Sequence, residues 1–131
     1  MRTVIHQPEF FPWTNFFYKV KKANSLIFLD NVQYNRRSFQ NRNYIKTNNG
    51  QIFLTVPIRK SSRDSLINEI EVDNTKNWAE EHLALLNCNY KKAKYFEPVY
   101  EFIKKIYLQK KWKYLYEFNM TSIKEIIKIL K

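Results

Sequence analysis

The first candidate for chemistry is the stretch Ile5–Trp13, IHQPEFFPW, which holds one of the two histidines of the chain. Histidine titrates near neutral pH, so His6 could serve as a general acid or base or could bind a phosphate. Pro8 and Pro12 restrict the backbone, and a stiff turn that presents His6 and Gln7 is expected. The alternative is a purely structural turn, with His6 hydrogen-bonded to backbone and the aromatic rings in the core.

The second candidate is the segment Asp30–Asn43, DNVQYNRRSFQNRN, which is dense in charged and amide side chains. Arginine offers a planar fork of donors that matches phosphate, and amides bind sugar hydroxyls. A solvated basic loop is the alternative. The predicted catalytic residues are His6 and Asp30, and the predicted substrate-binding residues are Gln7, Gln33, Tyr34, Arg36, Arg37, Gln40, Asn41, Arg42 and Asn43.

The elements that must position these residues begin with a strand–helix–strand pattern. Thr3–Ile5 predicts a short strand that ends near His6, and apolar residues at helical spacing after Pro12 predict an amphipathic helix. The continuous apolar run in Leu26–Asp30 predicts a buried strand. A parallel pair is expected, with His6 at its carboxyl end, where open α/β sheets bind ligands.

A β-hairpin is predicted around Asn49-Gly50, because Asn-Gly between two β-rich runs is a strong turn signal. Its strands are expected at about residues 40–47 and 51–57. Alternation along the first strand would place Gln40 and Arg42 on one face, with Asn41 and Asn43 on the other.

The second half of the sequence predicts helices. After another short strand at residues 67–72, apolar spacing predicts helices from a cap at Asn74 or Thr75, over residues 96–109, and from a cap at Thr121 or Ser122. The fold class expected is therefore α/β, with α+β as the alternative. Residues 1–131 are expected to form a single domain.

The formal charge is +11 and unevenly distributed. Residues 1–60 hold ten basic against two acidic residues, residues 61–90 two against six, and residues 91–131 eleven against four. Such a field favours nucleotides, phosphates or polyanions as partners. Surface lysines that merely keep the protein soluble are the alternative explanation.

Several classes of site are disfavoured. Gly50 is the sole glycine, so the sequence contains no P-loop and no Rossmann phosphate loop. The remaining metal candidates, His6, His82 and Cys88, have poor ligand spacing, so neither a metal nor a cofactor is expected. Nucleic acid binding remains an alternative, although no helix-turn-helix, zinc-finger or RNP-type signature supports it.

No apolar run reaches the roughly 18 residues that a membrane span requires, and the N-terminus lacks the apolar core of a secretory signal. Cys88 is the only cysteine, which excludes an internal disulfide and is compatible with a reducing compartment. A cytoplasmic location without a membrane span is expected.

Three segments resemble the WbqC-like protein family: IHQPEFFPWTNFFYKV, FLDNVQYNRRSFQNRNYIKT and LTVPI. The resemblance rests on a His-Gln-Pro-x-Tyr-x-Pro-Trp signature followed by Leu-Asp-x-Val-Gln-Tyr and Gln-Asn-Arg-Asn. Phe10 stands where tyrosine is usual, and Trp78 with His82 follows a further W-x-x-x-H pattern. The motif positions that match are His6, Gln7, Pro8, Pro12, Trp13, Asp30, Gln33, Tyr34, Gln40, Asn41, Arg42 and Asn43.

The resemblance implies a bacterial protein associated with gene clusters for O-antigen, the polysaccharide part of lipopolysaccharide, and related surface polysaccharides. It further implies an aminoacyl (glycyl) transferase role. Family members are usually longer, so the chain resembles their N-terminal half, and it would be inactive alone if catalysis needs both halves.

Three hypotheses follow. The leading one is a metal-independent transferase of aminoacyl, acyl or glycosyl type, or its binding half, acting on a nucleotide sugar or another phosphate-bearing small molecule. The second is a non-enzymatic basic module that binds nucleic acid or an acidic partner. The third is an assembly half that forms a homodimer or pairs with a missing C-terminal half.

Overall fold

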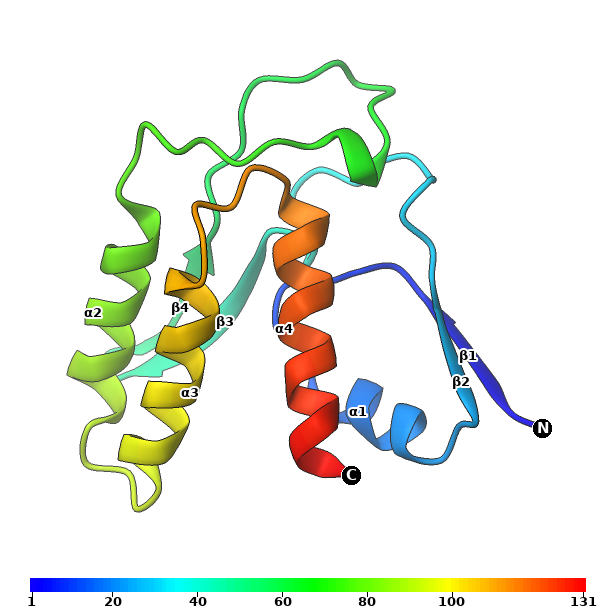
Figure 1. The fold of residues 1–131 in the computed structure, drawn as a ribbon. Coiled ribbons are helices and arrows are strands. Elements are labelled where there is room, and N and C mark those ends of the chain that lie inside the picture. The colour runs from blue at the N-terminus through cyan, green and yellow to red at the C-terminus, as the bar shows by residue number, and fades with distance from the viewer.

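The computed structural model describes every residue from Met1 to Lys131. Its elements are β1 (Thr3–His6), α1 (Thr14–Lys21), β2 (Ser25–Phe28), β3 (Arg42–Thr47), β4 (Gly50–Thr55), the 3-10 turn η1 (Ile67–Glu69), α2 (Trp78–Tyr90), α3 (Phe96–Leu108) and α4 (Leu115–Leu130). The predicted mixed α/β fold is confirmed. Helix α4 lies in the middle, with β1, β2 and α1 on one side and β3, β4, α2 and α3 on the other (Figure 1).

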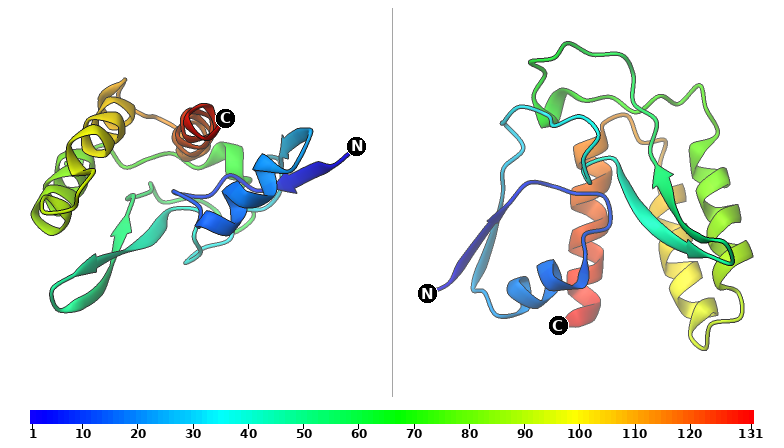
Figure 2. Two further views of the ribbon diagram at one scale, coloured as in Figure 1. Left: turned by 90° about the horizontal axis from the view of Figure 1, so that it is seen from below. Right: turned by 180° about the vertical axis from the view of Figure 1, so that it is seen from behind.

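Strands β1 and β2 form the predicted parallel pair, connected through α1, and His6 pairs with Phe28 at the carboxyl end. Helix α1 follows Pro12 and buries Phe16 and Val20, which pack against Ile123 of α4. The right view of Figure 2 shows α1 between this strand pair and α4.

The prediction that β2 is a buried strand is wrong. Leu26 and Phe28 face the helices, but Ile27 points away and is 48% exposed. Ile5 on β1 is exposed in the same way. The sheet has only two strands and helices on one face, so alternate side chains meet solvent.

Strands β3 and β4 form the predicted antiparallel hairpin, in which Arg42 lies opposite Thr55 and Thr47 opposite Gly50. Gly50 has a φ of +112°, a conformation that residues with a Cβ atom rarely adopt. One face of the hairpin buries Ile45 and Leu54 toward α2 and α3, and the other face is open.

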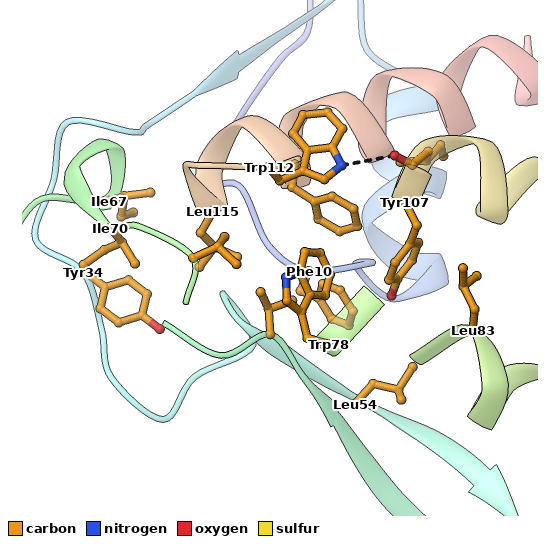
Figure 3. Close-up of a cluster of buried hydrophobic side chains, with 14 of the residues drawn as sticks. Phe10, Tyr34, Leu54, Ile67, Ile70, Trp78, Leu83, Tyr107, Trp112 and Leu115 are labelled. Atoms are coloured by element: carbon orange, nitrogen blue, oxygen red, sulfur yellow. Dashed lines mark hydrogen bonds between the residues drawn. The ribbon is translucent and has the colours of Figure 1, made fainter. Parts of the chain in front are cut away.

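The main core joins the hairpin, the long loop after it and the three C-terminal helices. Figure 3 shows Phe10, from the N-terminal turn, among side chains of these elements. Trp112 closes one side of the cluster, and its indole N–H donates to the backbone oxygen of Ile106 at 3.2 Å. Phe118, which is fully buried, contacts the rings of Phe10, Tyr107 and Trp112.

His82 of α2 ties this core together. Its Nε2 lies 2.9 Å from the backbone oxygen of Thr55, and its Nδ1 lies 3.0 Å from the hydroxyl oxygen of Tyr107. A carbonyl oxygen can only accept, so the Nε2–H group donates to Thr55 and Nδ1 accepts from Tyr107. The Trp78–His82 pair is therefore part of the packing, with ring centroids 5.5 Å apart.

Three boundaries differ from the sequence-based expectation. Residues 67–72 form η1 and isolated bridges, such as Ile58 opposite Val72, and no strand. Helix α2 begins at Trp78, after a turn in which Asp73 accepts hydrogen bonds from Thr75. Helix α4 begins at Leu115, well before the expected cap.

Both expected caps of α4 lie inside the helix. The buried Ser122 hydroxyl donates to the backbone oxygen of Phe118 at 2.8 Å, a bond to the preceding turn that satisfies a mid-helix serine. Although α4 is the longest helix, none of the helices combines the length and the apolar character needed to cross a bilayer.

Candidate functional site

The turn that follows β1 is held in place by amide side chains from distant segments. The Gln40 amide N–H donates to the Gln7 side-chain oxygen at 2.5 Å. The Asn43 amide donates to the backbone oxygen of Phe11 at 2.8 Å, and the buried Asn119 amide donates to the backbone oxygens of Pro8 and Gln40. Gln7, Gln40 and Asn43, which the sequence predicts as substrate-binding residues, are therefore engaged in fixing this turn.

His6, Asp30 and Gln33 lie along the neighbouring segments. His6 Nδ1 lies 2.7 Å from the backbone oxygen of Gln7, and the ring centroids of His6 and Phe16 are 4.8 Å apart at a steep angle. The Asp30 backbone oxygen accepts from the backbone N–H of Asn68, and the Gln33 amide donates to the backbone oxygen of Arg63. Catalytic roles for His6 and Asp30 stay predictions.

The structure gathers the other predicted residues around one pocket of about 360 Å³, called here the cationic pocket. Its predicted members come from the segment that precedes and opens β3, and further members come from the segment that follows β4. The lining residues are Tyr34, Arg36, Arg37, Asn41, Arg42, Thr55, Ile58, Arg59, Lys60 and Ser61.

Arg59, Lys60 and Ser61 are not among the residues predicted from the sequence, although the hairpin register contains the signal for them. Continuing the Arg42–Thr55 pairing outward brings the chain after β4 alongside the chain before β3. The backbone N–H of Val56 indeed donates to Asn41 at 2.7 Å. Arg36 donates to the backbone oxygen of Ser61 at 2.6 Å in the same register.

Asn41 and Arg42 share the pocket, although strand alternation predicts opposite faces for them. Strand β3 begins at Arg42, so Asn41 lies before the strand and is not bound by its alternation. The Asn41 amide donates to the backbone oxygen of Val56 at 3.2 Å, which fixes the side chain at the pocket.

Three of the four arginines of the pocket are not neutralised by acids. Arg36 and Arg42 donate to the backbone oxygens of Ser61 and Arg37, and no carboxylate lies within 4.0 Å of Arg36, Arg37 or Arg42. Arg59 does approach a carboxylate, that of Glu71, at 4.0 Å. Arg37 has a φ of +56°, a strained conformation for a residue with a Cβ atom. The pocket therefore retains a concentrated positive charge.

Two buried polar atoms of the pocket lining have no hydrogen-bond partner: the Tyr34 hydroxyl and the Asn41 side-chain oxygen. Burial raises the pKa of Tyr34 to about 12, although the charges of Arg36 and Arg42 act in the opposite direction. The hydroxyl therefore keeps its proton and can donate, while Asn41 can accept. Leaving such a group unpaired costs about 1–3 kcal/mol, so each of these two atoms has a hydrogen-bonding capacity that the fold does not use.

Comparisons with known proteins identify the family of this chain. The WbqC-like protein family matches residues 7–131. The chain belongs to the WbqC-like protein family. A relative from Mycobacterium tuberculosis, the uncharacterized protein Rv1507c, is 33% identical over 109 residues, which are 82% of this chain and 47% of the relative. The WbqC-like chain thus spans about half the length of that relative. No solved structure matches this chain.

In this WbqC-like chain, the position where tyrosine is usual lies away from the cationic pocket. Phe10 is 1% exposed and packs against Phe118 and His82 in the core. Phenylalanine in place of tyrosine at position 10 therefore affects the core and not the cationic pocket. No group of three or more His, Cys, Asp or Glu side chains gathers in a way that could hold a metal ion.

Proposed function

We propose that this chain supplies the substrate-binding part of a transferase in bacterial surface-polysaccharide synthesis. The substrate would be a nucleotide-activated sugar or a related phosphate-bearing molecule, and the transferred group aminoacyl, acyl or glycosyl. Membership of the WbqC-like family supports the pathway. The observation that carries the proposal is the cationic pocket, in which Arg36, Arg37 and Arg42 have no carboxylate within 4.0 Å.

The arginines suit the phosphate part of such a substrate. Each guanidinium presents a planar fork of N–H donors that matches phosphate oxygens in pairs. Arg36 and Arg42 each donate one hydrogen bond to a backbone oxygen, and their other N–H donors remain available. In a transfer reaction, fixed positive groups of this kind stabilise the charge that develops on a leaving phosphate.

Tyr34 and Asn41 suit a polar group beside the phosphates. A sugar hydroxyl can both accept a hydrogen bond and donate one, and the free Tyr34 hydroxyl and Asn41 oxygen offer the matching partners. The pocket volume of about 360 Å³ falls in the range typical of small-molecule sites.

In this proposal His6 and Asp30 keep the catalytic roles that the sequence predicts. Neither side chain lines the cationic pocket, so they would act on a part of the substrate that extends beyond it toward the carboxyl end of β1. Binding in the pocket can be tested separately from catalysis.

The test is the binding of pyrophosphate, measured by calorimetry at low salt. The Arg36→Gln/Arg37→Gln double variant should bind pyrophosphate at least about tenfold more weakly than the unaltered chain, because charged hydrogen bonds to phosphate are lost. The matched control is Lys91→Gln/Lys92→Gln, which removes the same charge from exposed positions after α2. If both double variants lose affinity equally, only net charge matters and the pocket is not the site.

A further inference from the structure

An exposed row of aromatic rings adjoins the cationic pocket. Trp13, Phe39, Tyr44 and Phe53 are 58%, 37%, 41% and 36% exposed, and we call them the aromatic strip. Ring centroids are 6.0 Å apart from Trp13 to Phe39, 6.3 Å from Phe39 to Tyr44 and 4.0 Å from Tyr44 to Phe53. The four rings therefore form one continuous surface.

Hairpin stability explains only half of this strip. Tyr44 and Phe53 lie opposite each other on the open face of β3 and β4, and their stacked rings support the strand pairing. Trp13 precedes α1 and Phe39 lies in the loop before β3, so neither belongs to the hairpin. A contiguous exposed aromatic surface from three separate segments is typical of a binding surface.

Arg42 joins the strip to the cationic pocket. Its guanidinium carbon lies 4.2 Å from the centroid of the Phe53 ring, and the same side chain lines the pocket. The strip therefore begins where the positive charge of the pocket ends. A ligand that fits both parts carries an anionic group at one end and a flat ring at the other.

We propose that the aromatic strip binds the base of a nucleotide whose phosphates occupy the cationic pocket. This inference rests on the proposed function and adds the recognition of the nucleoside to it. Bases stack on exposed aromatic side chains because every base has a π-face, and an adjacent arginine strengthens the interaction. A neutral sugar chain could stack on the rings, but it has no anionic group to pair with the arginines of the pocket. A nucleotide provides both, which favours it as the ligand.

The chain carries its own probe for this contact. Trp13 is exposed, whereas Trp78 and Trp112, the other two tryptophans, are 4% and 2% exposed. Uridine, adenosine or guanosine diphosphate should quench tryptophan fluorescence as it binds. Pyrophosphate should bind without quenching, and Trp13→Phe should abolish the nucleotide signal.

Calorimetry then separates base from phosphate. Tyr44→Ala should weaken nucleoside diphosphate about tenfold, the loss expected for one stacking partner, and should leave pyrophosphate affinity unchanged. Tyr44→Leu keeps the apolar contact with Phe53 and serves if the alanine variant does not fold. Tyr95→Ala is the matched control, because Tyr95 is 65% exposed, precedes α3 and makes no ring contact with the aromatic strip.

The outcomes are distinct. If nucleoside diphosphates and pyrophosphate bind equally and neither Tyr44 variant alters them, base recognition is wrong while the phosphate pocket stands. If neither ligand binds, both proposals are wrong. Two further results would overturn the nucleotide proposal in favour of another ligand class. One is much tighter binding of single-stranded oligonucleotides than of mononucleotides. The other is equally strong fluorescence quenching by neutral oligosaccharides.

Discussion

The amide and phenol side chains of the motif segments differ in whether their hydrogen-bonding groups are already used. Gln40 and Asn43 donate to the N-terminal turn, and their residue types alone did not reveal this role. Tyr34 and Asn41, from the same stretch, keep a buried polar atom without a partner. A sequence shows which groups are present, but only tertiary structure shows which of them remain free for a ligand.

Tyr34→Phe tests this distinction. Removing a hydroxyl that has no partner should raise the free energy of unfolding by about 1 kcal/mol, because the cost of burying it disappears. The same change should weaken the binding of a nucleotide sugar. Urea unfolding and calorimetry on the same preparations give both quantities, and a variant less stable than the unaltered chain would show that the hydroxyl is satisfied after all.

His82 carries a second residue-scale consequence. Burial lowers its pKa, with the hydrogen bond to Thr55 acting in the opposite direction. A histidine with a lowered folded-state pKa binds its proton more readily in the unfolded chain. Its contribution to stability is therefore complete above the unfolded pKa of about 6.5 and is lost as pH falls from there through the folded pKa.

Unfolding free energy measured between about pH 7.5 and about pH 5.5 should accordingly decrease toward the acidic end. His82→Gln cannot take up this proton, so its unfolding free energy should depend less on pH over that interval, whatever its absolute stability. A variant that keeps the full pH dependence would assign the effect to other groups.

Among the elements, the parallel strand pair and the hairpin were predictable because their signals are local. Periodicity identified β1, α1 and β2, and Asn49-Gly50 identified the hairpin. The start of α4 was not predictable from the sequence. Serine is a typical N-cap residue, but the Ser122 hydroxyl donates to the backbone of the preceding turn inside the helix. The exposure of β2 depends on how many strands join its sheet, and no local pattern contains that information.

Gly50 gives the prediction that belongs to the hairpin. Gly50→Ala should destabilise the fold by about 1–3 kcal/mol, because φ of +112° strains any residue with a Cβ atom. Nothing lies within 4 Å of a Cβ atom placed there, so the cost is conformational and not a steric clash. Thermal or urea unfolding measures it, with Asn48→Ala as the neighbouring control, and equal stability of Gly50→Ala and the unaltered chain would contradict the argument.

Over the whole molecule, folding concentrates a charge that the sequence shows only as a regional excess. The basic residues of 1–60 come from separate stretches, and the hairpin brings Arg36 and Arg37 beside Arg59 and Lys60. The pocket could have been inferred by extending the hairpin register. The aromatic strip could not, because Trp13 and Phe39 meet only through tertiary packing.

The open face of the β1–β2 sheet is a second property of the molecule as a whole. Ile5, Ile27 and Leu29 are exposed on or next to this sheet, and both of its edges lack further strands. Under the third hypothesis, pairing with a second copy or with a C-terminal half would cover this face. That pairing stays a prediction.

Arg42 has a thermodynamic consequence that follows from its double contact. One guanidinium lies over the Phe53 ring and lines the cationic pocket, so a ligand that shifts this side chain in one part alters its contact with the other. The two parts of a nucleotide then bind with a coupling free energy, and by reciprocity each alters the affinity of the other by the same factor. A phosphate and a nucleoside supplied as two separate molecules would therefore alter each other's affinity.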